Sequence, residues 1–142
     1  MALASTTQWL DNEEVVILIK KVKLCIWDRD FELPIEYDCY TGEKVTKEQI
    51  DAIEKFSKNE KVIKMAKEVV EKYCLKNVNA DNENQKKDNI FSYIKPDYLF
   101  VKREPNPRVA IMCKYRYDQE HGLAVIVSSD EKITVGLQDI IL

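Results

Sequence analysis

The sequence predicts a single α+β domain over residues 1–142, with an antiparallel sheet and a helical hairpin packed on one face of it. Three observations lead to this fold class. A length of 142 residues is typical of one domain. Apolar and polar residues alternate near both ends of the chain, and a helical period occupies the middle. Strands and helices that are separated along the chain in this way are typical of α+β domains.

A β-hairpin is predicted near the N-terminus. Residues 1–12 are expected to be loosely ordered, as chain ends often are, and the β-branched residues 15–19 indicate a short strand. Alternation over residues 21–27 and 31–38, on either side of a turn at residues 28–30, predicts the hairpin. Because Pro34 has no N–H to donate, the second strand is predicted to lie at a sheet edge.

Two helices are predicted next. Thr46 and Gln49 form a capping-box sequence, which places the start of a short helix at this point. A longer amphipathic pattern runs from about residue 59 to residue 75, so the two helices form a hairpin or a kinked pair. The polar residues 76–89 are interpreted as a mobile connector.

The remaining chain returns to strand patterns. Strands are predicted over residues 98–102, 108–117, 122–128 and 132–135. Residues 123–127 are apolar at every position, which is typical of a central strand covered on both faces.

Composition excludes several classes of function. The chain has 22 basic and 25 acidic residues, so the basic surplus of a nucleic-acid-binding protein is absent. No apolar run approaches the ~18–20 residues of a membrane span. Three widely separated glycines cannot form a phosphate-binding loop, and one histidine cannot form a histidine-based zinc site. We therefore expect no cofactor, no metal, no nucleic acid and no membrane contact.

The four cysteines indicate the compartment. They form no Cys-x-x-Cys pair, and three of them lie inside periodic apolar segments. The first residues also lack the basic start and long apolar stretch of a secretory signal. These features predict reduced, mostly buried thiols and a cytoplasmic location.

The segment from Asp118 to Gly122 contains the only histidine. One interpretation is an acid–base site in which Asp118 or Glu120 orients His121. The other interpretation is structural: Gly122 supplies a positive φ angle, and Asp118 and His121 satisfy backbone groups of the loop. We favour the structural interpretation, because no nucleophile or second basic group lies nearby in the sequence.

The N-terminal hairpin carries a second candidate site. Its acidic positions could form a docking surface for a basic partner, or only a solvated edge. Trp27 falls on the face opposite the apolar residues of its strand, where it is either covered by a helix or exposed as a binding anchor. The candidate partner-binding residues are Trp27, Asp28, Asp30, Glu32, Glu36 and Asp38.

Two stretches together resemble a group of small bacterial domains of unknown function. The first covers residues 33–38 and 46–56, and the second is Asp118-Gln119-Glu120-His121-Gly122 with residues 123–125 and 135–139. Members of this group often carry tryptophan before the acidic loop, where Tyr115 or Tyr117 stands here. Such domains look like immunity proteins of toxin–immunity systems, and no catalytic residues are attached to them.

The resemblance implies a non-enzymatic protein that neutralises a bacterial toxin domain by direct binding. Two other classes stay open at this point. One is a small enzyme that uses His121 with Asp118 or Glu120, and the other is a general protein-interaction module. A pocket at His121 would favour the enzyme, whereas a broad or grooved face elsewhere would favour a binding protein.

Overall fold

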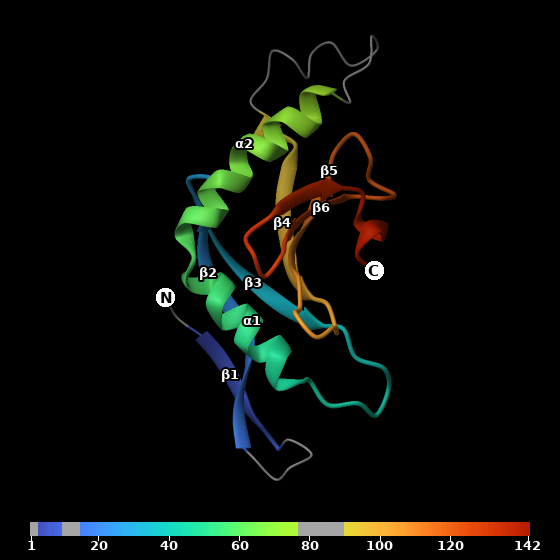
Figure 1. Ribbon diagram of the computed structural model, residues 1–142. Helices are drawn as coiled ribbons and strands as arrows, with labels where there is room; N and C mark the ends of the chain where they lie inside the picture. Colours follow the sequence, from blue (N-terminus) through green and yellow to red (C-terminus); the bar gives the residue numbers. More distant parts are fainter. Residues whose placement is uncertain (1–2, 10–14, 77–89) are drawn as a thin grey trace.

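The protein folds into one seven-stranded sheet with two helices on one of its faces (Figure 1). The structure, a computed structural model, describes residues 3–9, 15–76 and 90–142, and the side chains of residues 19–76 and 91–142. The strands follow one another across the sheet in chain order. They are β1 (Leu3–Trp9), β2 (Val15–Ile26), β3 (Arg29–Tyr37), β4 (Ile94–Val101), β5 (Val109–Tyr115), β6 (Leu123–Val127) and β7 (Ile133–Gly136). The helices are α1 (Lys47–Lys58) and α2 (Glu60–Lys76), with short 3₁₀ turns η2 (Ile90–Ser92) and η3 (Gln138–Ile140).

The sheet is mixed, which corrects the prediction of a purely antiparallel one. Five neighbouring pairs are antiparallel, but β3 and β4 run parallel, from Ile35 opposite Leu99 to Tyr37 opposite Val101. Parallel neighbours need a long crossover connection. The helices α1 and α2 lie within this crossover.

Pro34 does not mark a sheet edge, so that prediction is wrong. Arg29–Pro34 of β3 pair with β2, and Ile35–Tyr37 pair with β4. Pro34 is therefore the last residue paired with β2, directly before pairing with β4 begins. A residue without an N–H is tolerated there because it lies where one ladder ends and the next starts.

The N-terminal strands also differ from the prediction. Leu3–Trp9, expected to be loosely ordered, form β1 and pair with β2. The strands expected at residues 15–19 and 21–27 are one continuous strand, Val15–Ile26, and its register with β1 shifts at residue 20, between the pairs formed by Ile19 and Lys21. Most of the predicted connector, residues 77–89, lies outside the described residues, and Lys76 ends α2.

The helices lie end to end and do not form the predicted hairpin. In Figure 1, α2 continues away from the end of α1 along the same face of the sheet. One residue, Asn59, separates them: its φ and ψ of −97° and 74° end α1. Its side chain accepts a hydrogen bond from the Val62 N–H at 3.1 Å and so caps α2.

The predicted capping box at the start of α1 is confirmed. Thr46 Oγ1 accepts from the Gln49 N–H at 3.1 Å, and Gln49 Oε1 accepts from the Thr46 N–H at 3.0 Å. Gln49 Nε2 also donates to the carbonyls of Asp38 and Val101, at 3.1 and 3.2 Å. This fully buried side chain fastens the helix to the ends of the parallel strands β3 and β4.

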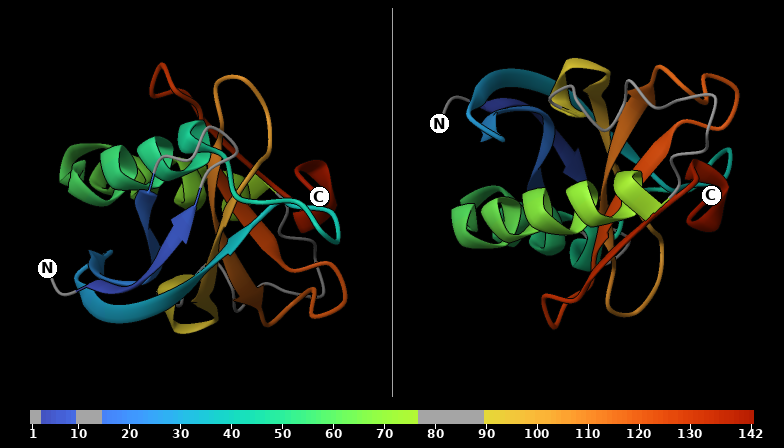
Figure 2. Two further views of the ribbon diagram at one scale, coloured as in Figure 1. Left: turned by 90° about the horizontal axis from the view of Figure 1, so that it is seen from below. Right: turned by 90° about the horizontal axis from the view of Figure 1, so that it is seen from above.

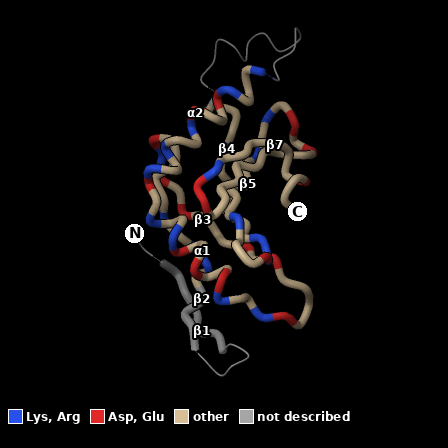
Figure 3. Tube along the Cα trace, in the orientation of Figure 1, with Lys and Arg blue, Asp and Glu red and all other residues tan. Residues whose placement is uncertain are grey.

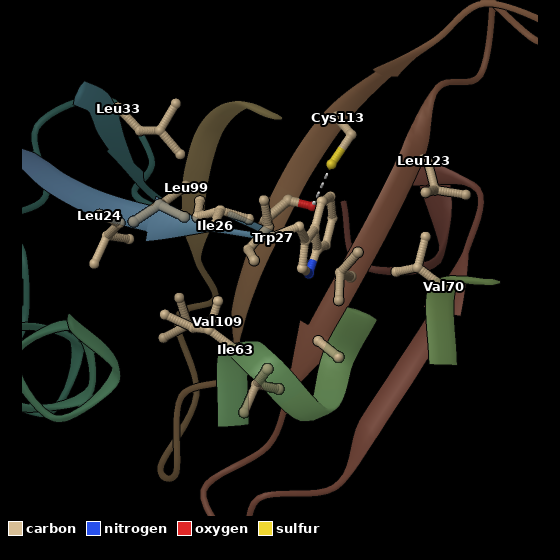
Figure 4. Packing of buried hydrophobic residues seen from close by; sticks show 14 of the residues in the cluster. Leu24, Ile26, Trp27, Leu33, Ile63, Val70, Leu99, Val109, Cys113 and Leu123 are labelled. Carbon is tan, nitrogen blue, oxygen red and sulfur yellow. Dashed lines mark hydrogen bonds between the residues drawn. The ribbon is translucent and has the colours of Figure 1, made fainter. Parts of the chain in front are cut away.

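Buried apolar side chains cover both faces of the central strands. On the helix side, Ile63 and Val70 of α2 face strand residues such as Leu99 and Leu123 (Figure 4). A smaller cluster of buried residues includes Ile141. The C-terminal turn lies across the sheet from the helices (Figure 2). All five residues of β6 are buried, which confirms its prediction as a central strand.

Candidate functional site

The loop that joins β5 to β6 is organised around Asp118. Asp118 Oδ1 accepts from the His121 N–H at 3.2 Å and lies 2.9 Å from His121 Nδ1, and the Asp118 carbonyl accepts from the Gly122 N–H at 2.9 Å. Gly122 has a φ of +62°. The structural interpretation of this loop predicted this positive φ angle and these hydrogen bonds to backbone groups.

The contact between Asp118 and His121 shifts the pKa of both side chains. The hydrogen bond from His121 lowers the pKa of Asp118, and the same bond raises the pKa of His121. The imidazole side chain is 47% exposed, so solvent screens this pair strongly. Among the described residues, Asp118 is the only hydrogen-bond partner of the His121 ring, and Glu120 is exposed. An orienting carboxylate is present, but no nucleophile of the described residues contacts the imidazole.

Two buried cysteines are poor nucleophiles. Cys113 is fully buried and its thiol donates to the Ile111 carbonyl, so burial holds its pKa far above the ordinary value. Burial also raises the pKa of Cys74 to about 11. Cys39 is half-buried and Cys25 is exposed, so the prediction of mostly buried thiols is wrong for Cys25.

The C-terminal segment locks the loop, which sequence reasoning missed. The Gln138 N–H donates to the His121 carbonyl at 3.2 Å, and Gln138 Nε2 donates to the Cys113 carbonyl at 3.0 Å. A Cβ on Gly122 would lie 2.7 Å from the Gln138 side chain. Residues 118–125 and 135–139, the two parts of the second resembling stretch, therefore meet in space at the contact between Gly122 and Gln138.

The β2–β3 hairpin does not present the acidic docking surface that the sequence suggested. Trp27 is only 6% exposed and packs against Phe91 at 4.9 Å between ring centroids, so it is covered and cannot anchor a partner. Glu32 lies opposite Lys23, with 4.0 Å between charged atoms, and Lys21 lies opposite Pro34 on the same strand pair. The hairpin therefore carries both signs of charge.

The other acidic residues of the hairpin have different surroundings and do not form one surface. Asp28 is 3.0 Å from Lys67 of α2. Asp38 lies 3.5 Å from Lys102 and accepts from the Arg103 N–H at 3.1 Å. Asp30 and Glu36 are exposed at opposite ends of β3. Acidic and basic positions are likewise interspersed along the described chain (Figure 3).

A groove that sequence reasoning did not find lies where α1 meets α2. We call it the junction groove; its volume is about 250 Å³. Figure 1 shows the β4–β5 and β6–β7 loops approaching α1 there. Its lining residues come from the two helices and the residue between them, the two loops, and the adjoining ends of β5 and β6: Glu48, Asp51, Ala52, Lys55, Phe56, Asn59, Val62, Pro105, Asn106, Pro107, Val109, Val127, Ser128, Ser129 and Glu131.

The junction groove combines buried apolar side chains with an acidic rim. Phe56, Val62, Val109 and Val127 in its lining are buried. The rim holds three carboxylates, Glu48, Asp51 and Glu131, and all three residues are exposed. Within the described residues, none of these carboxylates is in an ion pair.

The polar contacts around the junction groove hold its walls in place. The one lysine of the lining, Lys55, donates from Nζ to the Ser129 carbonyl at 3.1 Å. Asn59 Nδ2 donates to Glu131 Oε1 at 2.7 Å, which ties the helix junction to the β6–β7 turn. Arg108 contacts both carboxylate oxygens of Glu104 at 2.9 and 3.0 Å and braces the proline-containing loop.

A second hollow, of about 600 Å³, lies against β4, β5 and the β5–β6 loop. Gly122 and Gln119 line it, whereas His121 does not. The histidine therefore lies beside a hollow rather than in one.

Comparison with known proteins identifies the family. Residues 5–142 match the family described as "Domain of unknown function (DUF6985)". The chain belongs to this family. No curated protein and no solved structure matches the chain. In this DUF6985 domain, no described group of three or more His, Cys, Asp or Glu side chains could hold a metal ion. Within the described residues, no helix has the length and apolar character needed to cross a membrane.

Proposed function

We propose that this DUF6985 domain is a non-enzymatic immunity protein that neutralises a toxin domain by binding it at the junction groove. The observation that carries the proposal is the pairing of a buried apolar floor with exposed carboxylates that have no ion pairs in the described chain. An apolar centre inside a charged rim is the composition of a protein docking site. The C-terminal resemblance to immunity proteins points to the same class.

The charge of the groove indicates the chemistry of the partner. Glu48, Asp51 and Glu131 face a single lysine, whose ammonium group is already bound to a carbonyl. A complementary segment would insert an apolar side chain and place lysine or arginine against the rim. Toxin domains that attack nucleic acids carry such basic surfaces, because their substrate is a polyanion.

The walls of the groove favour tight binding. Two helices and two braced loops form them, and contacts such as Lys55–Ser129 and Asn59–Glu131 hold them together before a partner arrives. A preorganised surface loses little conformational entropy on association. A bound domain can block the active surface of a toxin without any catalytic group of its own. The proposal includes a cytoplasmic location for the protein.

The alternative enzyme would use His121 with Asp118 or Glu120. Asp118 accepts from both the ring and the backbone of His121, which supports a structural role for this carboxylate. A substrate panel on the wild type and on His121→Ala separates the two functions. Turnover that disappears in His121→Ala while the fold survives would favour the enzyme.

A growth-rescue assay tests the proposal. The toxin probe is the C-terminal domain of the secreted protein encoded beside this chain's gene, expressed in a bacterial host with or without the DUF6985 domain. We expect the wild type to restore growth. Neutralising the rim in Glu48→Gln/Asp51→Asn should reduce rescue, because two attractive charges are lost.

A matched variant serves as the control. Glu32→Gln/Glu36→Gln removes two carboxylates from the β2–β3 hairpin and changes the net charge equally. It should rescue growth like the wild type. Loss of rescue in this control alone would move the docking site to the hairpin, and absence of rescue by the wild type would contradict an immunity function.

A further inference from the structure

The second hollow, which lies on the sheet face away from the helices, has three basic residues in its lining. We call it the outer hollow. It lies on β4 and β5, next to the apolar cluster that includes Ile141. Its volume of about 600 Å³ is within the usual range of small-molecule sites. Its lining residues are Ser92, Tyr93, Lys95, Asp97, Tyr98, Cys113, Lys114, Tyr115, Arg116, Gln119, Gly122 and Gln138.

Two of its lysines lie in an electrostatically unfavourable arrangement. Lys95 of β4 is directly opposite Lys114 of β5 in the antiparallel ladder, and both are exposed. Side chains at such positions start only ~4.5–5.5 Å apart, so like charges there destabilise the sheet. No carboxylate forms an ion pair with either lysine in the described part of the chain.

Arg116 adds a third cation on the same face. Its N–H donates to the Tyr93 carbonyl at 2.9 Å, so pairing with the strand continues one residue beyond β5. Residues two apart along a strand share a face, which places Arg116 beside Lys114. Asp97, in the bulge of β4, is the one carboxylate of the lining, so positive charge exceeds negative charge by two.

Asp97 and Tyr98, at the bulge of β4, also line the hollow. Burial, with the charges of Glu36 and Asp97, raises the pKa of the Tyr98 hydroxyl. A negatively charged group is favoured beside Lys95 and Lys114, which lie opposite one another in the ladder and outnumber the one carboxylate of the lining. The half-buried Tyr98 ring leaves an aromatic surface for an uncharged part of a ligand.

We propose that the outer hollow binds a small, multiply charged anion of the phosphate-ester class between Lys95, Lys114 and Arg116. A compact dianion satisfies both ammonium groups at once, and the guanidinium fork matches two phosphate oxygens. Binding relieves the repulsion between Lys95 and Lys114. The site lies on a different face from the junction groove and does not depend on the proposed partner.

Calorimetry with inorganic pyrophosphate tests the site. The wild type should bind one pyrophosphate, and the melting temperature should rise with its concentration at constant ionic strength. Lys114→Gln and Lys95→Gln should each bind about tenfold more weakly, because each removes one charge-assisted contact. Lys64→Gln, an equal charge change on the exposed face of α2, should bind like the wild type.

A second readout does not require the ligand. Without pyrophosphate, Lys114→Gln should melt at the same temperature as the wild type or about a degree higher at low salt, because the like-charge pair is gone. Undiminished binding by Lys114→Gln and Lys95→Gln would overturn the proposal. So would no binding to the wild type, or tighter binding of citrate than of pyrophosphate, which would assign the hollow to carboxylates.

Discussion

Gly122 shows how one residue joins two distant segments. Its φ of +62° is a conformation that side chains with a Cβ adopt at a cost of ~1–2 kcal/mol. An added Cβ would also lie 2.7 Å from the Gln138 side chain and 3.0 Å from the Cys113 carbonyl. The sequence predicted the positive φ, but the contact with Gln138 arises only when the C-terminus folds back.

A pair of glycine variants separates these two effects. Gly42 also has a positive φ, of +87°, but has no atom within 4 Å of an added Cβ. Gly42→Ala should lower the free energy of unfolding by about 1 kcal/mol through backbone strain alone. Gly122→Ala should cost about 1 kcal/mol more, because Gln138 must move and lose its bond to Cys113. Urea unfolding measures both values, and equal losses would show that Gln138 does not lock the loop.

The pair formed by Asp118 and His121 predicts how stability depends on pH. The folded-state pKa of His121 is raised. Its contribution to the free energy of unfolding is therefore complete at low pH and is lost as pH rises through that pKa. The folded-state pKa of Asp118 is lowered, so its contribution is present above the ordinary value and is lost as pH falls. The pair therefore stabilises the fold most between the ordinary values of 3.8 and 6.5.

His121→Asn tests this dependence. Its deficit in melting temperature relative to the wild type should be largest near pH 5 and should shrink above the raised pKa of His121. Melting curves across pH 3–9 provide the measurement. A deficit that stays constant over this range would mean that the ion pair contributes nothing and that only neutral hydrogen bonds hold the loop.

At the scale of elements, the crossover between β3 and β4 depends on Gln49. Its side chain completes the capping box and donates to one carbonyl at the end of each parallel strand. Capping sequence and helical period predicted the start of α1 correctly, because both are local signals. Alternation identifies a strand and its faces but not its neighbour, so the parallel pairing of β3 with β4 could not be predicted from the sequence.

Two variants compare how much the helix cap and the contacts with the strand ends contribute to the free energy of unfolding. Thr46→Ala should lower the free energy of unfolding by ~1 kcal/mol, the usual cost of losing an N-cap. Gln49→Leu should cost more, about 2–3 kcal/mol, because it removes half of the capping box and one donor from each of the Asp38 and Val101 carbonyls. Denaturant unfolding gives both values. A smaller loss in Gln49→Leu than in Thr46→Ala would mean that the helix start, and not the strand ends, depends on this side chain.

At the scale of the whole molecule, both hollows are assembled from segments far apart in the chain. The junction groove takes residues from positions 48–62, 105–109 and 127–131, and no motif in these stretches indicates a binding site. The sequence indicated an acidic surface on the β2–β3 hairpin because its acidic residues are close together in sequence, but cross-strand lysines and separate ion pairs divide these residues in the structure. Charge patterns predict a surface only after strand pairing is known.

If a basic partner docks in the junction groove, the kinetics of its association depend on the charges of the groove rim. Stopped-flow mixing of the toxin domain with the wild type, Glu48→Gln/Asp51→Asn and Glu32→Gln/Glu36→Gln, each at low and physiological salt, gives the association rate constants. Rim charges act mainly on the association rate. We predict fast, salt-sensitive association for the wild type and the hairpin variant, and several-fold slower, less salt-sensitive association for the groove variant. Equal rates for the groove variant and the wild type, or association indifferent to salt, would show that the partner does not dock against the rim of the junction groove.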